Sequence, residues 1–165
     1  MERKTWPGPA FWKLLTIAML MLALTSPGWS QSAPDFALKD VLRGQEYTLS
    51  QFRGKVVLLN FFTFECKPCR QEMPALNQLD RELKNQGFQT LGVGLASDPA
   101  QLQSLARQLG LDDPVLAGTD QVSRAYGNIE FVPTTFIIDR QGNIAHKVTE
   151  ARSKEAFLKL LRPLL

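Results

Sequence analysis

Apolar residues along this chain fall into two patterns, short continuous runs and longer segments with a helical spacing. Residues 56–62 form a run with a single polar side chain, which predicts a central β-strand buried on both faces. Residues 70–86 instead predict a helix with one buried face, because their apolar positions recur every three or four residues. Those positions are Met73, Leu76, Leu79 and Leu83. Strands are also predicted at 89–95 and 114–116, separated by a helix that Asp98 caps.

The remaining elements are short and are bounded by turn residues. In order they are a helix capped by Asp120 and ending at Tyr126, a strand at 134–139, a turn at 140–143, a strand at 144–148 and a final helix capped by Ser153. Two short strands at 36–38 and 47–49 form a hairpin near the start. Alternating strands and helices build a mostly parallel sheet with helices on both faces. We therefore predict an α/β fold with a mixed, mostly parallel central sheet and an N-terminal β-hairpin extension.

Residues 1–30 have the features of a secretory signal peptide. Basic residues come first, the apolar run 14–24 follows, and small residues then break it, which suits cleavage after Ser30. The run is shorter than the roughly 20 residues that a membrane span needs. The alternative is an uncleaved N-terminal anchor. Residues 31–165 then form one domain, which we expect to work outside the cytoplasm, in the periplasm or an equivalent compartment.

The charge of the chain argues against nucleic acid as a partner. The formal net charge is +3, and residues 1–30 carry three basic side chains and one acidic side chain. The small positive charge left on the rest of the chain does not give the basic surface that nucleic-acid binding requires. We expect a monomer with no nucleic-acid partner.

The two cysteines, Cys66 and Cys69, are separated by two residues at the predicted junction of the strand 56–62 and the next helix. A helix N-terminus carries partial positive charge and unpaired N–H groups, and both favour thiolate over thiol. We assign Cys66, the first and more exposed cysteine, the role of attacking nucleophile. Cys69 is then placed to resolve a mixed disulfide. Pro68 lacks an N–H, which costs nothing in the first turn of a helix.

Other uses of a cysteine pair fit this chain less well. A zinc site needs four ligands, and the sequence has no second cysteine pair and only one histidine, His146. Two inert buried cysteines are the ordinary structural alternative. A purely structural disulfide across so short a loop would contribute little chain entropy. The strand–CxxC–helix order therefore favours a redox role that needs no metal and no other cofactor.

Several motifs together resemble the TlpA/ResA branch of the thioredoxin superfamily. They are an opening segment at 33–36, a run at 49–56, a strand ending at Asn60, the segment 66–74 with Glu72 and Pro74 after the cysteines, and the segment 132–136 followed by Asp139. The resemblance extends over about residues 33–165. It implies a thioredoxin fold and thiol–disulfide exchange outside the cytoplasm.

The resemblance also implies a second half of the site. Pro133 is expected to be cis and to pack beside Cys66, and the chain around it, at Val132, Pro133 and Thr134, is expected to bind the substrate. The implied substrates are protein thiols and disulfides. The implied partner is a membrane electron donor that re-reduces the cysteine pair. Cytochrome c maturation is one pathway that would use such a reductase.

The sequence departs from this family at the residue before the first cysteine, where Glu65 replaces the usual tryptophan. A carboxylate beside a thiol disfavours the thiolate, so it opposes the helix N-terminus and the neighbouring Lys67. We hypothesise that Glu65 tunes the pair toward the low reduction potential of a reductase, and we count Lys67 and Pro68 as further redox-tuning residues. The alternative is that Glu65 is a solvated side chain with little effect.

Two other functions remain open. Thr63 and Cys66 also match the Thr-x-x-Cys motif of peroxiredoxins, in which the hydroxyl binds the peroxide, so a thiol peroxidase is one alternative. A redox-inert module that holds a partner or copper is the other. Copper-binding relatives of this fold use a cysteine spacing one residue longer and a distant histidine, whereas His146 is most simply a surface residue.

Overall fold

The computed structural model describes residues 31–165, so the predicted signal peptide at 1–30 lies outside the described residues. In chain order the elements are β1 (Ala37–Lys39), β2 (Glu46–Thr48), the 3₁₀-helix η1 (Leu49–Phe52), β3 (Val56–Phe62), α2 (Lys67–Leu83), the 3₁₀-helix η2 (Lys84–Gln86), β4 (Phe88–Gly94), α3 (Pro99–Leu109), β5 (Val115–Ala117), α4 (Asp120–Ala125), β6 (Thr134–Ile138), β7 (Ile144–Val148) and α5 (Lys154–Leu161). None of these helices has the length and apolar character needed to cross a membrane.

The central sheet has five strands in the order β5-β4-β3-β6-β7. β3 pairs in parallel with β4, and β4 with β5, whereas β6 is antiparallel to both β3 and β7. The predicted mixed sheet with an antiparallel closing edge is therefore confirmed. β1 and β2 form the predicted N-terminal hairpin as a separate antiparallel pair, and a bridge between Asp40 and Leu116 connects the hairpin to the edge strand β5.

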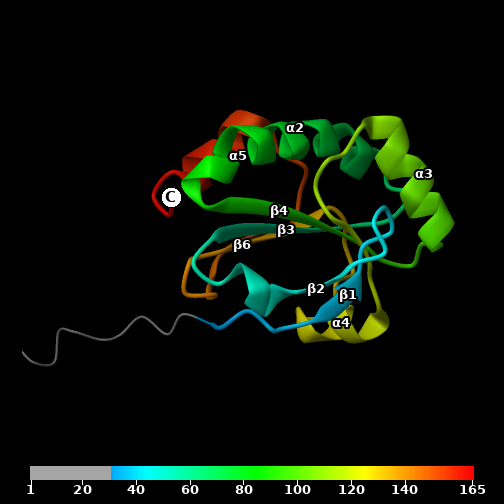
Figure 1. The fold of residues 1–165 in the computed structure, drawn as a ribbon, viewed down its shortest axis with the longest axis horizontal. Helices are drawn as coiled ribbons and strands as arrows, with labels where there is room; N and C mark the ends of the chain where they lie inside the picture. The colour runs from blue at the N-terminus through cyan, green and yellow to red at the C-terminus, as the bar shows by residue number, and fades with distance from the viewer. Residues whose placement is uncertain (1–30) are drawn as a thin grey trace, which may run out of the picture.

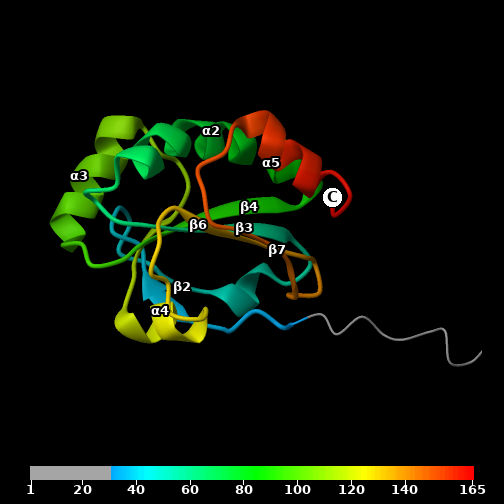
Figure 2. The same cartoon turned by 180° about the vertical axis from the view of Figure 1, so that it is seen from behind.

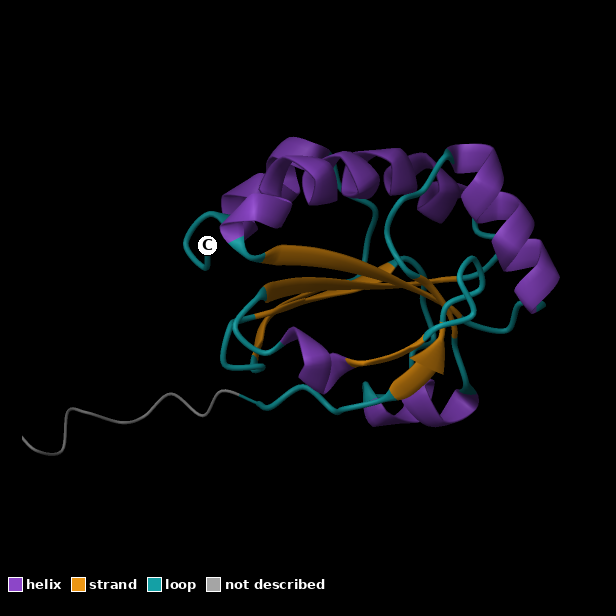
Figure 3. Ribbon diagram, viewed as in Figure 1, coloured by secondary structure: helices purple, strands orange, loops and turns teal. Residues whose placement is uncertain are grey.

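Helices cover both faces of the sheet, as the layers in Figures 1 and 3 show. α2, α3 and α5 lie on one side, and α4, η1 and the hairpin lie on the other, which Figure 2 shows from behind. β3 is buried along its whole length because its apolar side chains alternate between the two covered faces of the sheet. Leu59 and Phe61 pack in the cluster under the hairpin and α4, whereas Val56 and Leu58 pack against α2 and α5.

The active-site helix begins three residues earlier than the sequence predicted, at Lys67 instead of residue 70. The sulfur of Cys66 occupies the N-cap position and accepts from the backbone N–H of Cys69, so the whole CxxC segment belongs to the start of the helix. The prediction that Asp120 caps α4 is wrong. Thr119, and not Asp120, accepts from the backbone N–H of Val122, and Asp120 lies inside the first turn.

Candidate active site

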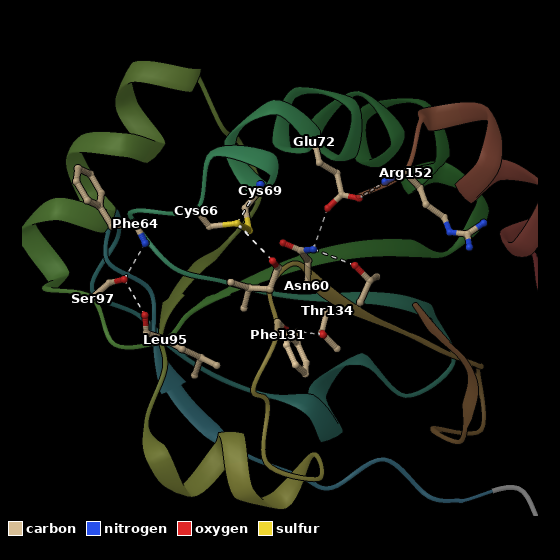
Figure 4. Close-up of a disulfide and its surroundings, with 12 residues drawn as sticks. Asn60, Phe64, Cys66, Cys69, Glu72, Leu95, Ser97, Phe131, Thr134 and Arg152 are labelled. Atoms are coloured by element: carbon tan, nitrogen blue, oxygen red, sulfur yellow. Dashed lines mark hydrogen bonds between the residues drawn. A yellow bond between two sulfur atoms is a disulfide. The ribbon is translucent and has the colours of Figure 1, made fainter. Parts of the chain in front are cut away.

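Cys66 and Cys69 form a disulfide at the N-terminus of α2, with their Cα atoms 5.3 Å apart (Figure 4). The Cys66 side chain is partly exposed, whereas Cys69 is completely buried. This confirms the expectation that Cys66 is the more exposed cysteine. The backbone N–H of Cys69 lies 3.2 Å from Cys66 Sγ, so a helix N–H group points at the sulfur that is accessible to a substrate.

The loop before β6 forms the second wall of the site. Its Val132–Pro133 peptide bond is cis, as expected, and the carbonyl oxygen of Val132 lies 3.7 Å from Cys66 Sγ. Thr134 Oγ1 donates to the carbonyl oxygen of Phe131 at 2.7 Å, which fixes the loop on the other side of the proline. Pro133 and Thr134 are buried, whereas Val132 is partly exposed. Of the three predicted substrate-binding residues, Val132 is therefore the one that a substrate can reach.

A buried carboxylate lies one helical turn beyond Cys69. Glu72 is only 4% exposed, and its two oxygens accept from different parts of the fold. Oε2 accepts from Asn60 Nδ2 of β3 at 3.3 Å, and Oε1 accepts from the backbone N–H of Arg152 at 2.8 Å (Figure 4). Asn60 Nδ2 also lies 2.9 Å from Thr135 Oγ1. This network joins the central strand, the active-site helix and the loop before α5.

Burial raises the pKa of Glu72 to about 7, and the hydrogen bonds from Arg152 and Asn60 oppose that rise. Glu72 therefore changes its charge near neutral pH, within one turn of the buried sulfur. In the sequence, Glu72 stands out only as part of the motif after the cysteines, which predicts no role for it. Its spacing carries a usable signal, because Glu72 stands four and seven residues before Leu76 and Leu79 of the buried helix face.

The chain just before Cys66 is anchored from the loop between β4 and α3. Ser97 Oγ accepts from the backbone N–H of Phe64 at 2.9 Å and donates to the carbonyl oxygen of Leu95 at 2.7 Å (Figure 4). The guanidinium of Arg70 lies 5.8 Å from the centre of the Phe64 ring. Ser97 is 33 residues from Phe64, so no local pattern in the sequence predicts this contact.

A small cavity lies behind the site, between α2 and the strands β4 and β5. Thr90 and Asp113 contribute buried oxygen atoms without a hydrogen-bond partner there, and Asn60 and Met73 also line it. Burial, followed by the nearby charge of Asp80, raises the pKa of Asp113 to about 9. Asp113 is therefore a neutral carboxylic acid at neutral pH.

The predicted tuning residues Glu65, Lys67 and Pro68 are all exposed and border Cys66 on the surface. Thr63 is partly buried, and its backbone carbonyl accepts from the N–H of Cys66 at 3.2 Å. His146 lies in β7, away from the cysteines in the sheet order. Within residues 31–165, no three His, Cys, Asp or Glu side chains are grouped closely enough to hold a metal ion.

This arrangement is suited to disulfide exchange: the sulfur of Cys66 at the helix N-terminus is partly exposed, the sulfur of Cys69 is buried behind it, and the Val132 carbonyl lies beside the first sulfur. The exposed sulfur can form a mixed disulfide with another chain. The buried sulfur is protected from that chain but lies within reach of the first sulfur. The Val132 carbonyl can accept a hydrogen bond from the bound chain.

Comparisons with known proteins agree with this chemistry. Residues 29–147 match the AhpC/TSA family. The thiol-disulfide oxidoreductase ResA of Geobacillus kaustophilus (strain HTA426) is 40% identical over 132 residues, which cover 79% of this chain and 75% of that protein. The thioredoxin-like protein YneN of Bacillus subtilis (strain 168) is 38% identical over 117 residues, 69% of this chain and 67% of that protein. A crystal structure of a thiol:disulfide interchange protein of the thioredoxin family, from Chlorobium tepidum TLS, superposes with a TM-score of 0.78 at 27% identity and covers 84% of this chain and 99% of that one.

Proposed function

This chain belongs to the AhpC/TSA family and is a thiol–disulfide oxidoreductase with a thioredoxin fold, and on that premise we propose that it reduces the disulfides of protein substrates outside the cytoplasm. The observation that carries the proposal is the arrangement of the two sulfurs. Cys66 is reachable beside the Val132 carbonyl, and Cys69 is buried within disulfide distance of it. No observation on residues 31–165 favours the thiol peroxidase or the copper-binding module over exchange.

The exchange proceeds in two steps. The Cys66 thiolate attacks one sulfur of a substrate disulfide, an S–S bond forms between the two proteins, and the other substrate sulfur leaves as a thiolate. The Cys69 thiolate then attacks Cys66 Sγ, and the second substrate sulfur leaves. Two electrons pass from the dithiol to the substrate, and the Cys66–Cys69 disulfide of the structure is the product.

Glu72 is suited to handle the proton of the second step. Cys69 must lose its proton before it attacks, and it is completely buried. Glu72 follows it by three residues on the same helix face, and its pKa of about 7 lets it accept a proton at neutral pH. The hydrogen bond from Asn60 joins this carboxylate to the central strand.

The direction of exchange depends on how strongly the protein stabilises the Cys66 thiolate. The helix N-terminus stabilises it, whereas the exposed carboxylate of Glu65 beside Cys66 disfavours it. A less stable thiolate makes the dithiol form a stronger reductant. We therefore assign Glu65 the tuning of the pair toward reduction. Lys67 and Pro68 are the other tuning residues, and the positive charge of Lys67 acts in the opposite direction to Glu65.

The cellular setting follows from the N-terminal segment. A secretory signal at residues 1–30 would deliver the domain to a compartment in which the pair becomes oxidised. Continued reduction of substrates then needs a membrane electron donor that returns two electrons to the Cys66–Cys69 disulfide. The domain would act as a monomer. Cytochrome c maturation is a suitable pathway, because attachment of haem requires reduced cysteines.

The reduction potential of the Cys66–Cys69 pair tests this proposal. The full-length chain is equilibrated in a series of thiol–disulfide buffers, its free thiols are alkylated, and the mass shift reports the fraction reduced. A potential near about −250 mV or lower supports a reductase, whereas a value near about −120 mV would make the protein an oxidant. If no Cys66–Cys69 disulfide forms, exchange by this pair is excluded.

A further inference from the structure

Phe131 is a large apolar side chain that is 72% exposed and stands directly before the loop that contacts the reactive sulfur. No other large hydrophobic side chain of residues 31–165 is exposed in this way. A single exposed apolar residue is ordinary on a protein surface, so its location carries the argument. Val132 follows it, and the Val132 carbonyl lies 3.7 Å from Cys66 Sγ.

The exposure of Phe131 does not result from a loose loop. On one side, Ile129 packs against the core under α4, and its backbone N–H donates to Ser123 Oγ at 3.0 Å. On the other side, the buried Thr134 donates to the carbonyl oxygen of Phe131 itself. The backbone is therefore fixed on both sides while the ring extends into solvent. Figure 4 shows Phe131 on this loop, together with Thr134 and the disulfide.

Other apolar side chains also lie in the segments that flank the disulfide. Phe64 and Val132 are both partly buried and pack against the same apolar cluster as Cys66, which contains Cys69 and Met73. Phe131 adds a phenyl ring beyond Val132. Exposed or partly exposed apolar side chains are therefore present in both segments that flank Cys66: Phe64 in the one before it, and Phe131 and Val132 in the loop before β6.

We propose that Phe131 is a specificity-determining residue, which binds an apolar side chain located one or two residues from the cysteine that Cys66 attacks in a substrate. This inference rests on the proposed function. Successive Cα atoms lie about 3.8 Å apart, so a substrate chain bound along Val132 with its cysteine at Cys66 places its neighbouring side chains opposite Phe131. Burial of two apolar surfaces against each other would then favour substrates with Leu, Ile, Val or Phe beside the cysteine.

Two peptide probes test the proposal with the reduced full-length protein. Each peptide carries one cysteine in a disulfide with 2-nitro-5-thiobenzoate, and the residue next to the cysteine is Leu in one and Ser in the other. Cys66 attacks the peptide sulfur, and the coloured nitrothiobenzoate leaves as a thiolate. Cys69 then releases the peptide thiol. Oxidised glutathione is a third, small and polar probe of exchange itself.

We expect the wild-type rate constant for the Leu peptide to exceed that for the Ser peptide about tenfold. In Phe131→Ser this ratio falls close to one, and in Phe131→Leu most of it is retained. Glu130→Gln, a change at the neighbouring exposed residue, leaves the ratio as in the wild type. The ratio is the decisive readout, because a general disturbance of the loop would slow both peptides together and leave their ratio intact.

Three results would overturn the proposal. The first is a wild-type ratio near one. The second is an unchanged ratio in Phe131→Ser. The third is a wild-type protein that sediments as a dimer and becomes a monomer in Phe131→Ser, since a second copy of the chain would then cover the ring. In each of these cases the reduction of oxidised glutathione by the protein still supports the proposed function. If wild-type protein exchanges with none of the three probes, the proposed function fails and this inference fails with it.

Discussion

Asn60 Nδ2 donates a hydrogen bond to Glu72 Oε2 at 3.3 Å, and through this contact the central strand holds a carboxylate that is buried beside the redox pair. The other oxygen of Glu72 accepts from the backbone of Arg152, in the loop before α5. Two hydrogen bonds only partly offset the desolvation of this group, and its pKa therefore rises to about 7.

The free energy of unfolding should depend on the charge of Glu72. The pKa of Glu72 rises from 4.5 to about 7 on folding. The contribution of Glu72 to stability is therefore fully present below about pH 4.5 and is lost as the pH rises through about 7. Glu72→Gln removes this dependence. Its stability relative to the wild type should rise by about 3 kcal/mol between pH 4.5 and pH 8. Denaturant unfolding of the oxidised proteins, followed by circular dichroism, measures the difference.

Glu82 provides the matched control for this prediction. It lies on the same helix but is exposed, and its hydrogen bond with Lys154 lowers its pKa. Glu82→Gln should therefore shift the pH dependence of stability in the opposite direction to Glu72→Gln. An equal pH dependence in wild type and Glu72→Gln would contradict the assignment of this titration to Glu72.

Replacement of Cys66 and replacement of Cys69 should each block a different step of the exchange. Cys69→Ser retains the exposed Cys66 thiol but loses the buried attacking group, so the mixed disulfide with a substrate accumulates. Cys66→Ser leaves a thiol that substrates do not reach, so neither a mixed disulfide nor turnover is expected. Mass spectrometry after acid quenching detects the trapped species. A mixed disulfide on Cys69 in the Cys66→Ser protein would reverse the assigned roles.

The order of the elements was predictable because their boundaries carry local signals. Asp98 and Ser153 cap their helices as predicted, and the run 56–62 is fully buried between two helical layers. The bounds of α2 were less predictable, because the cap is a cysteine sulfur and not one of the usual oxygen-bearing side chains.

The site was predictable only where its residues are close in sequence or belong to a motif. The CxxC pair met both conditions. The contact of Ser97 with Phe64 and that of Arg152 with Glu72 join residues 33 and 80 positions apart, and their partners are backbone groups that any residue provides. Such contacts depend on how the strands and loops come together, so the sequence pattern of either segment alone does not encode them.

Asp113→Asn should stabilise the protein at neutral pH. The pKa of Asp113 rises from 3.8 to about 9 on folding, so its contribution to stability is fully present below pH 3.8 and decreases as the pH rises toward 9. Asparagine is neutral at every pH, so its burial does not require the uptake of a proton. Its amide can also donate to the nearby carboxylate of Asp80. We expect a gain of roughly 2 to 4 kcal/mol at pH 7. Unfolding in urea measures it, with the exposed Asp120→Asn as the control. A loss of stability would show that the neutral acid makes a contact that asparagine does not replace.

Glu65→Gln tests whether the residue before Cys66 sets the direction of exchange. Glu65 is exposed, so water screens its charge, and the effect on its neighbour is expected to be modest. Removal of the negative charge should lower the pKa of the Cys66 thiol by about half a pH unit. The reduction potential should rise by about 15 mV, which makes the pair a weaker reductant. The rate of alkylation of Cys66 as a function of pH gives the thiol pKa, and equilibration in thiol–disulfide buffers gives the reduction potential.

Glu46→Gln, an exposed change in the N-terminal hairpin, should alter neither value. If the thiol pKa of Glu65→Gln equals that of the wild type, Glu65 is only a solvated side chain, and the helix N-terminus and Lys67 set the potential without it.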